Sequence, residues 1–247
     1  MLPAYDLKKI KFTVDPPTFE RATALYESGK VTEISESGGY CYAVVFGTKR
    51  YDVSVSLKDF KRGDCTCYLG QRDVLCKHIV AVSLYIVMNG HPLKEEDKQF
   101  SVGVRCSGRL AGMSKEELSG VQKSISAAMR CIKPYSGPSS TWFRNQDSLS
   151  EGCRMLSAIV SDLPINQETA KILVKLLLRL DKKLCMGGVD DSNGIVSGLM
   201  YDVVNLLQEY VRMDDKCMEV FKGLLGKDTC FNWENPLVRM FEAWHKG

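Results

Sequence analysis

Three cysteines and a histidine, Cys65, Cys67, Cys76 and His78, share one short segment with the spacing Cys-x-Cys-x8-Cys-x-His. Thiolate and imidazole are preferred ligands of zinc in proteins, and four of them complete its tetrahedral shell. Catalytic zinc sites usually keep one position for water, so a closed set of three thiolates and one imidazole predicts a structural ion. We therefore expect one structural Zn2+, although ferrous iron or cobalt also suits such a cage.

The local pattern explains how these four side chains can meet. Cys65 and Cys67 are two residues apart, so on an extended segment both point to the same face. Gly70 allows a turn in the eight-residue spacer, and the apolar run from Ile79 to Met88 predicts a buried helix. Zinc ligation of this kind contributes on the order of 10 to 16 kcal/mol, so we expect metal removal to unfold the module.

The residues around the cluster predict an antiparallel sheet with helices. Period-two hydrophobicity marks strands at Val31 to Glu36, Tyr40 to Phe46 and Tyr51 to Leu57. The residues Ser37-Gly38-Gly39 form the turn between the first two strands. A helix from Thr18 to Ser28 precedes them, because its apolar residues have helical spacing and Gly29 follows as a cap.

The cluster resembles the SWIM zinc finger, whose signature is Cys-x-Cys, a variable spacer, and then Cys-x-His. The upstream residues Phe19-Glu20-Arg21-Ala22, Gly29-Lys30-Val31 and Tyr51-Val53-Val55 resemble the strand-rich segment that precedes this signature. The resemblance covers about residues 15 to 90 and assigns the metal to Cys65, Cys67, Cys76 and His78. It implies DNA binding or protein contacts, since such modules occur beside helicase-like ATPases, transposases, ubiquitin-ligase parts and recombination accessory factors.

The rest of the chain reads as helical. Ser114 and Glu117 form a capping-box pattern at the start of a helix that reaches about Ile132, and Pro134 to Thr141 breaks any regular structure. Later helices are predicted at Trp142 to Leu163, at Gln167 to Asp181, and from about Gly194, Lys216 and Pro236. The expected fold class is α+β: a zinc module of antiparallel sheet and helix at 1–92, a basic connecting segment with one helix at 93–140, and an all-helical bundle or short helix-pair stack at 141–247.

Positive charge is concentrated in the middle of the sequence. From Lys98 to Gln146 there are eight basic residues and two acidic ones, Glu116 and Glu117, whereas the whole chain carries only +3. Such a segment suits nucleic acid, because Lys and Arg supply phosphate contacts and an exposed aromatic can stack on an unpaired base. An ordinary solvated face explains it equally well. The candidate nucleic-acid contacts are Arg72, Lys77, Arg105, Arg109, Lys123 and Arg130.

Composition and the remaining motifs predict the class and location of the protein and the state of its other cysteines. With 45% hydrophobic residues, 26% charged residues and no apolar run of bilayer length, we expect a folded intracellular protein, cytoplasmic or nuclear, with no membrane partner. In that reducing setting the ten cysteines are expected to stay unpaired, the seven outside the cluster serving mostly as core residues. The stretch Asp190 to Gly194 fails as a calcium loop, and His91 and His245 show no catalytic partners.

We therefore expect a non-enzymatic zinc protein that acts as an accessory factor. Its SWIM-type module would bind DNA, a protein of the DNA-processing machinery, or both. The alternative is a protein-interaction adaptor in which zinc is purely structural and no nucleic acid binds.

Overall fold

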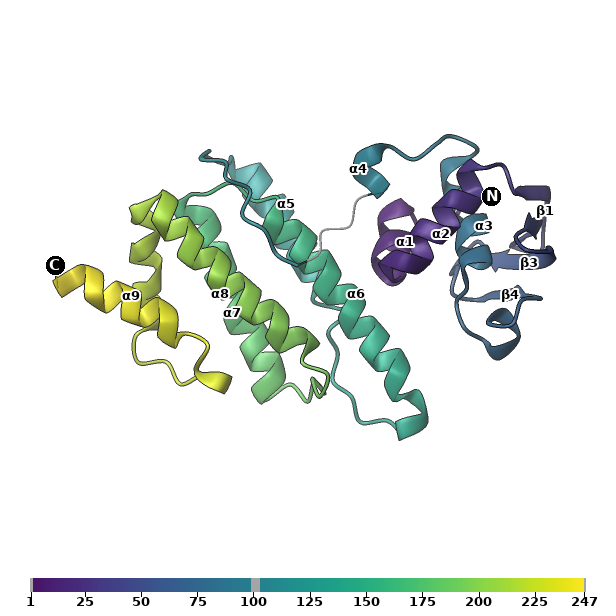
Figure 1. Cartoon of the computed structure of the whole chain (residues 1–247). Coiled ribbons are helices and arrows are strands. Elements are labelled where there is room, and N and C mark those ends of the chain that lie inside the picture. The colour runs from purple at the N-terminus through teal and green to yellow at the C-terminus, as the bar shows by residue number, and fades with distance from the viewer. Residues whose placement is uncertain (1, 99–102, 247) are drawn as a thin grey trace. The chain divides into compact units, whose positions relative to one another are not determined.

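The computed structural model describes residues 2–98 and 103–246 and shows an α+β protein (Figure 1). The chain divides into two compact units, Met1–Phe100 and Ser101–Gly247. The predicted fold class is confirmed: a four-stranded antiparallel sheet comes first, and the remainder is mostly helical. No helix within the described residues is long and apolar enough to cross a bilayer.

The first unit is a sheet with helices packed on one face. Its strands follow the order β1-β2-β3-β4, and the turn between β1 and β2 uses Gly38 and Gly39, both with positive φ. Such φ values match the twist of a tight hairpin. The elements are α1 Leu7–Thr13, α2 Pro16–Glu27, β1 Val31–Ser37, β2 Tyr40–Phe46, β3 Arg50–Ser56, β4 Gly63–Cys65, η1 Gly70–Arg72, α3 Lys77–Met88 and α4 Glu95–Lys98.

The core of this unit lies between the sheet and α3. Val45, Val53 and Val55 point from the sheet toward this core and are almost fully buried, and α3 buries its residues from His78 to Leu84. α3 packs against all four strands and so covers the inner sheet face, and α2 packs against α3 (Figure 1). The packing of the sheet against α3 therefore positions the metal ligands, which lie at the end of β4 and the start of α3.

The second unit is a helical bundle with one apolar core. α6 packs against α5 and α8, while α7 packs against α8 and η3. Leu149, Leu177 and Tyr210 are fully buried at its centre. The elements are α5 Lys115–Ala128, η2 Ser139–Thr141, α6 Trp142–Ser161, α7 Gln167–Cys185, α8 Ile195–Met213, η3 Asp215–Leu224, η4 Cys230–Asn232 and α9 Asn235–Lys246.

Several elements differ from the sequence-based expectations. α1 was not predicted, although Asp6 caps it by accepting a hydrogen bond from the Lys9 amide at 2.7 Å. The helix predicted from about Lys216 is present as a 3-10 helix, Asp215–Leu224. The predicted connecting segment 93–140 is shared between the units, and α5 within it packs on the helical core through Ile125 and Ala128.

The expectation that all cysteines stay unpaired is wrong for two of them. Cys185, at the end of α7, and Cys230, at the start of η4, are joined as a disulfide. The Oδ1 of Asp181 accepts hydrogen bonds from the Cys230 amide at 2.8 Å and from the Trp233 indole at 2.9 Å. These bonds hold η4 against the end of α7 and so bring the two cysteines together. The two cysteines are 45 residues apart in sequence, so no local sequence pattern predicts that they lie close together.

Candidate metal centre

The four predicted ligands converge at the junction of β4 and α3. Cys65 is the last residue of β4, Cys67 follows it two residues later, and Cys76 is the N-cap of α3. His78 lies in the first turn of that helix. All four side chains are buried, and their ligand atoms lie within 4.8 Å of one another.

The distances fit a tetrahedral zinc ion. The His78 Nδ1 lies 3.7 Å from the Cys65 Sγ and 3.9 Å from the Cys76 Sγ. With Zn–S bonds of about 2.3 Å and Zn–N bonds of about 2.0 Å, a tetrahedron has S···N edges of roughly 3.6 Å. Three thiolates and one imidazole fill all four positions, so the centre holds one structural Zn2+ and leaves no position for a catalytic water.

The backbone of the loop between the ligands is shaped around the sulfurs. The Cys67 amide donates to the Cys65 Sγ at 3.5 Å, and the Gly70 amide donates to the Cys67 Sγ at 3.3 Å. A Cβ at Gly70 would lie only 2.3 Å from the Cys65 carbonyl oxygen, so only glycine permits this approach. Amide donors of this kind stabilise negative charge on the sulfurs.

The imidazole ligand is fixed by its surroundings. The ring of Tyr51 stacks on His78 with 4.2 Å between centroids and an interplanar angle of 25°. With Nδ1 turned toward the sulfurs, the buried Nε2 lies beside Gly47, where a Cβ would approach it to 3.1 Å. A metal-bound Nδ1 places the ring proton on Nε2, for which the structure shows no hydrogen-bond partner, so the stacked Tyr51 ring fixes the orientation of the imidazole.

The pKa values of the Cys65 and Cys76 thiols are shifted in opposite directions. A hydrogen bond from the Cys65 thiol lowers the pKa of Cys76, and His78 and the Ile79 amide lower it further against the effect of burial. The same hydrogen bond, and then burial, raise the pKa of Cys65. Cys76 lies at the N-terminus of α3, where the helix dipole favours an anion.

Three of the seven remaining cysteines are core residues, which is fewer than expected, since Cys106 and Cys131 are only half-buried and Cys185 and Cys230 are paired. Cys41, Cys153 and Cys217 are buried. Burial raises the pKa of both Cys153 and Cys217 to about 12, so these thiols stay neutral. A second group of possible ligands consists of Asp181, Cys185 and Cys230, but the sulfurs are bonded to each other and Asp181 is engaged by two hydrogen bonds.

The predicted nucleic-acid contacts fall into separate groups. Arg72 lies in η1, with its guanidinium carbon 3.5 Å from the Tyr68 ring centroid, and Lys77 opens α3. Arg105 and Arg109 precede α5, and Arg109 forms an ion pair with Asp162 at 3.0 Å. Lys123 is exposed on α5 and Arg130 is exposed just after it. The stacking of Arg72 on Tyr68 was not foreseen, because sequence reasoning valued Arg72 only for its charge.

The fold and the site together define a module with a structural zinc held between a short strand and a buried helix. Residues 51–86 match the SWIM zinc finger family, a span that begins in β3, includes all four ligands and ends in α3. This confirms the resemblance inferred from the spacing of the ligands. No curated protein and no solved structure matches the chain.

Proposed function

We propose that this is a non-enzymatic zinc protein whose SWIM module binds single-stranded nucleic acid through the loop between its ligands. The observation that carries the proposal is the exposed pair formed by Tyr68, which is 70% exposed, and the guanidinium of Arg72 stacked on its ring. One face of the Tyr68 ring is covered by a cation, and a base can stack on the aromatic side chain while Arg72 meets a phosphate.

The metal explains why this loop is suited to binding. Tyr68 directly follows the ligand Cys67, and the eight-residue spacer ends at the ligand Cys76, so zinc holds both ends of the loop. Leu69 and Val74 in the same loop are also exposed, at 44% and 46%. A loop held in this way loses little conformational freedom when it binds, which favours affinity.

Replacing Tyr68 tests this proposal. We expect Tyr68→Ala to weaken binding of a fluorescein-labelled 20-nucleotide single strand, DNA or RNA, by about 5- to 150-fold, because base stacking on an aromatic contributes about 1–3 kcal/mol. The measurement is fluorescence anisotropy of the full-length, zinc-loaded protein at about 50 mM salt. Tyr201→Ala is the matched control, since Tyr201 is 55% exposed on α8 in the other unit. No binding by the wild-type protein, or equal losses in both variants, would refute the proposal.

A second candidate function, protein binding, is favoured by the outer face of the sheet. A groove of about 660 Å3 crosses this face and reaches the zinc loop at Gly70. Four carboxylates line it, from Glu33, Asp52, Asp64 and Asp73. Arg50 pairs with Glu33 at 3.0 Å and with Asp52 at 3.4 Å, but its single positive charge offsets only one of the four negative charges, so the groove stays acidic. Acidic walls repel phosphates and attract a partner rich in Lys and Arg.

The two candidate functions separate in a capture experiment. If the groove holds a basic protein segment, full-length protein retains one stoichiometric partner from native extract after nuclease treatment. Asp52→Asn/Asp64→Asn then loses this partner. The control Glu219→Gln/Glu242→Gln removes the same charge from exposed positions in the helical unit and keeps the partner. A partner that survives the groove substitutions, or disappears with nuclease, contradicts the adaptor function.

A further inference from the structure

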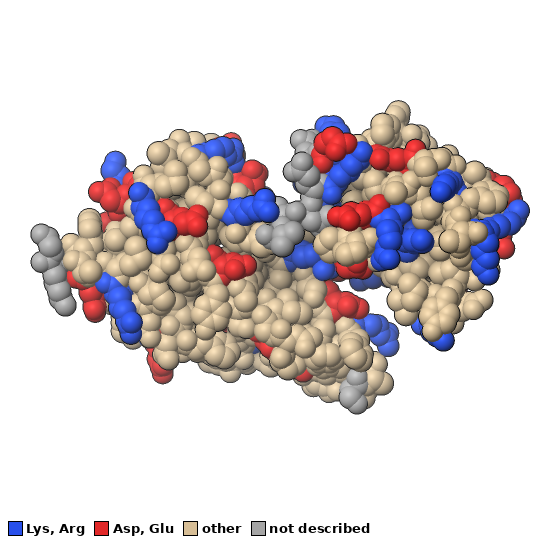
Figure 2. Space-filling view, in the orientation of Figure 1, with Lys and Arg blue, Asp and Glu red and all other residues tan. Residues whose placement is uncertain are grey.

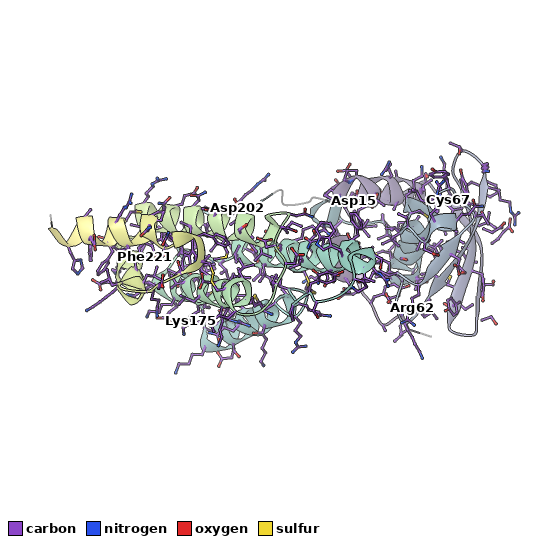
Figure 3. The ribbon with its side chains drawn as sticks, turned by 90° about the horizontal axis from the view of Figure 1, so that it is seen from below. Asp15, Arg62, Cys67, Lys175, Asp202 and Phe221 are labelled. Atoms are coloured by element: carbon purple, nitrogen blue, oxygen red, sulfur yellow. A yellow bond between two sulfur atoms is a disulfide. The ribbon has the colours of Figure 1, made fainter. Side chains whose placement is uncertain are left out.

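The outward face of α7 carries only basic side chains along most of its length. Between Ala170 and Leu184 the exposed residues are Lys175, Arg179 and Lys182, while Leu173, Leu177 and Leu180 on the opposite side are buried in the bundle core. Lys175, labelled in Figure 3, lies at the margin of the helical unit. Within the described residues, none of these three bases forms an ion pair with a carboxylate.

α5 extends this basic face. The Arg179 Nη1 lies 3.4 Å from the Ser126 hydroxyl of α5, which brings the two helices together at this point. Lys123 and Arg130 lie three residues before and four residues after Ser126, and both are exposed. Lys123 lies one turn before Ser126 on α5, so its charge lies beside those of α7, whereas Arg130 follows the end of this helix at Ala128.

The charges in this region are crowded enough to affect one another. Lys183 follows Arg179 by one turn of α7 and donates from Nζ to the carbonyl of Ile132 at 2.6 Å. Burial, and then the positive charge of Arg179, lower the pKa of Lys183. Lys183 and Arg179 therefore lie close enough for their positive charges to interact. The face of the molecule shown in Figure 2 is not uniformly basic, since basic and acidic side chains are interspersed over it.

We propose that this basic face, formed by Lys175, Arg179 and Lys182 of α7 with Lys123 of α5, binds the phosphate backbone of nucleic acid. The inference rests on the proposed nucleic-acid function and places a second contact on the helical unit. Lys175 and Lys182 are seven residues apart, which corresponds to about 10 Å along the helix axis. Over that length each strand of a duplex presents about three phosphates, one per 3.4 Å.

Nucleic acid fits this face better than a membrane or an acidic protein does. A membrane-surface helix needs large apolar side chains to insert beside its bases. A stable protein interface needs an apolar centre. Between Ala170 and Leu184 no exposed residue of α7 has a large apolar side chain. The first exposed one is Met186, which follows the end of the helix. Phosphate contacts require only unpaired positive charge, which is what the exposed side of α7 provides.

Charge reversal on α7 tests the inference. The variant Lys175→Glu/Arg179→Glu/Lys182→Glu is compared with Lys216→Glu/Lys222→Glu/Lys227→Glu, which reverses three exposed bases on or just after η3 and causes the same change in net charge. We expect the α7 variant to lose at least about tenfold in affinity for a labelled 30-base-pair duplex and a 30-nucleotide single strand at about 100 mM salt. Its slope of log K against log salt should flatten by about 3, one for each lost phosphate contact.

The outcomes separate this inference from the proposed function of the zinc loop. Equal losses in the two triple variants, or no loss in the α7 variant, overturn the inference, and the effect of Tyr68→Ala then decides the zinc-loop proposal alone. A loss in the α7 variant with none in Tyr68→Ala supports the basic face and refutes the zinc loop. If wild-type protein binds vesicles containing anionic lipid and not nucleic acid, and the α7 variant abolishes this, the face is a membrane contact and the inference is wrong. Circular dichroism and zinc content of each variant confirm that it is folded.

Discussion

Removing zinc is expected to unfold the first unit and leave the helical unit folded. Cys65, Cys67 and Cys76 belong to the apolar core between the sheet and α3, so the ion ties β4 to that helix from inside. The ligation free energy, about 10–16 kcal/mol, matches or exceeds the net stability of a typical domain. The second unit has its own separate core and contains none of the four ligands.

The tryptophans make this prediction simple to measure. All three, Trp142, Trp233 and Trp244, lie in the helical unit, and Trp233 is only 2% exposed. After treatment with a strong chelator, tryptophan fluorescence should change little. Hydrogen exchange in β2, β3 and α3 should accelerate to the rate of an unfolded chain and recover when zinc is restored. Slow exchange in α3 of the metal-free protein would contradict the prediction.

Replacing a single ligand is expected to have the second largest effect. Cys76→Ser removes one of the three thiolate ligands and leaves a buried hydroxyl in its place. Loss of an outer-shell partner of a zinc site typically costs 10- to 100-fold in metal affinity, so loss of a direct ligand should cost more than about 100-fold. Competition with a chromophoric chelator measures this directly.

Cys41→Ser supplies the matched control for that substitution. Cys41 lies in β2 of the same unit and, like Cys76, is 1% exposed, but it is not part of the ligand cluster. The control should lower the free energy of unfolding of the zinc-loaded protein by about 1–3 kcal/mol, because a hydroxyl is buried, and leave zinc affinity within about threefold of wild type. If both variants lose zinc equally, burial and not coordination explains the loss.

The metal centre was predictable because residues close together in the sequence specify it. The spacing of Cys65 and Cys67 fixes their shared face on an extended segment, and the apolar run after His78 fixes the buried helix that carries the remaining ligands. The structure confirms the metal cluster and the sheet-plus-helix frame. The requirement for Gly70 was less visible, because it depends on a close approach to the Cys65 carbonyl that only the folded loop creates.

Features made by distant segments were not predictable in this way. Asp181, Cys185 and Cys230 meet only because η4 folds back over the end of α7. The basic face of α7 was missed for a different reason. Acidic residues around α7 cancel its bases in any total of charge over a long segment. Which charges share a surface is decided by helix rotation and by the neighbouring α5, which segment totals do not represent.

The coordination of the metal can itself be measured. Elemental analysis combined with zinc-edge X-ray absorption on purified full-length protein should find one zinc per chain, bound by three sulfurs at about 2.3 Å and one nitrogen at about 2.0 Å. Absence of a stoichiometric metal, or a shell containing oxygen ligands in place of these sulfurs, would contradict a closed centre built from Cys65, Cys67, Cys76 and His78.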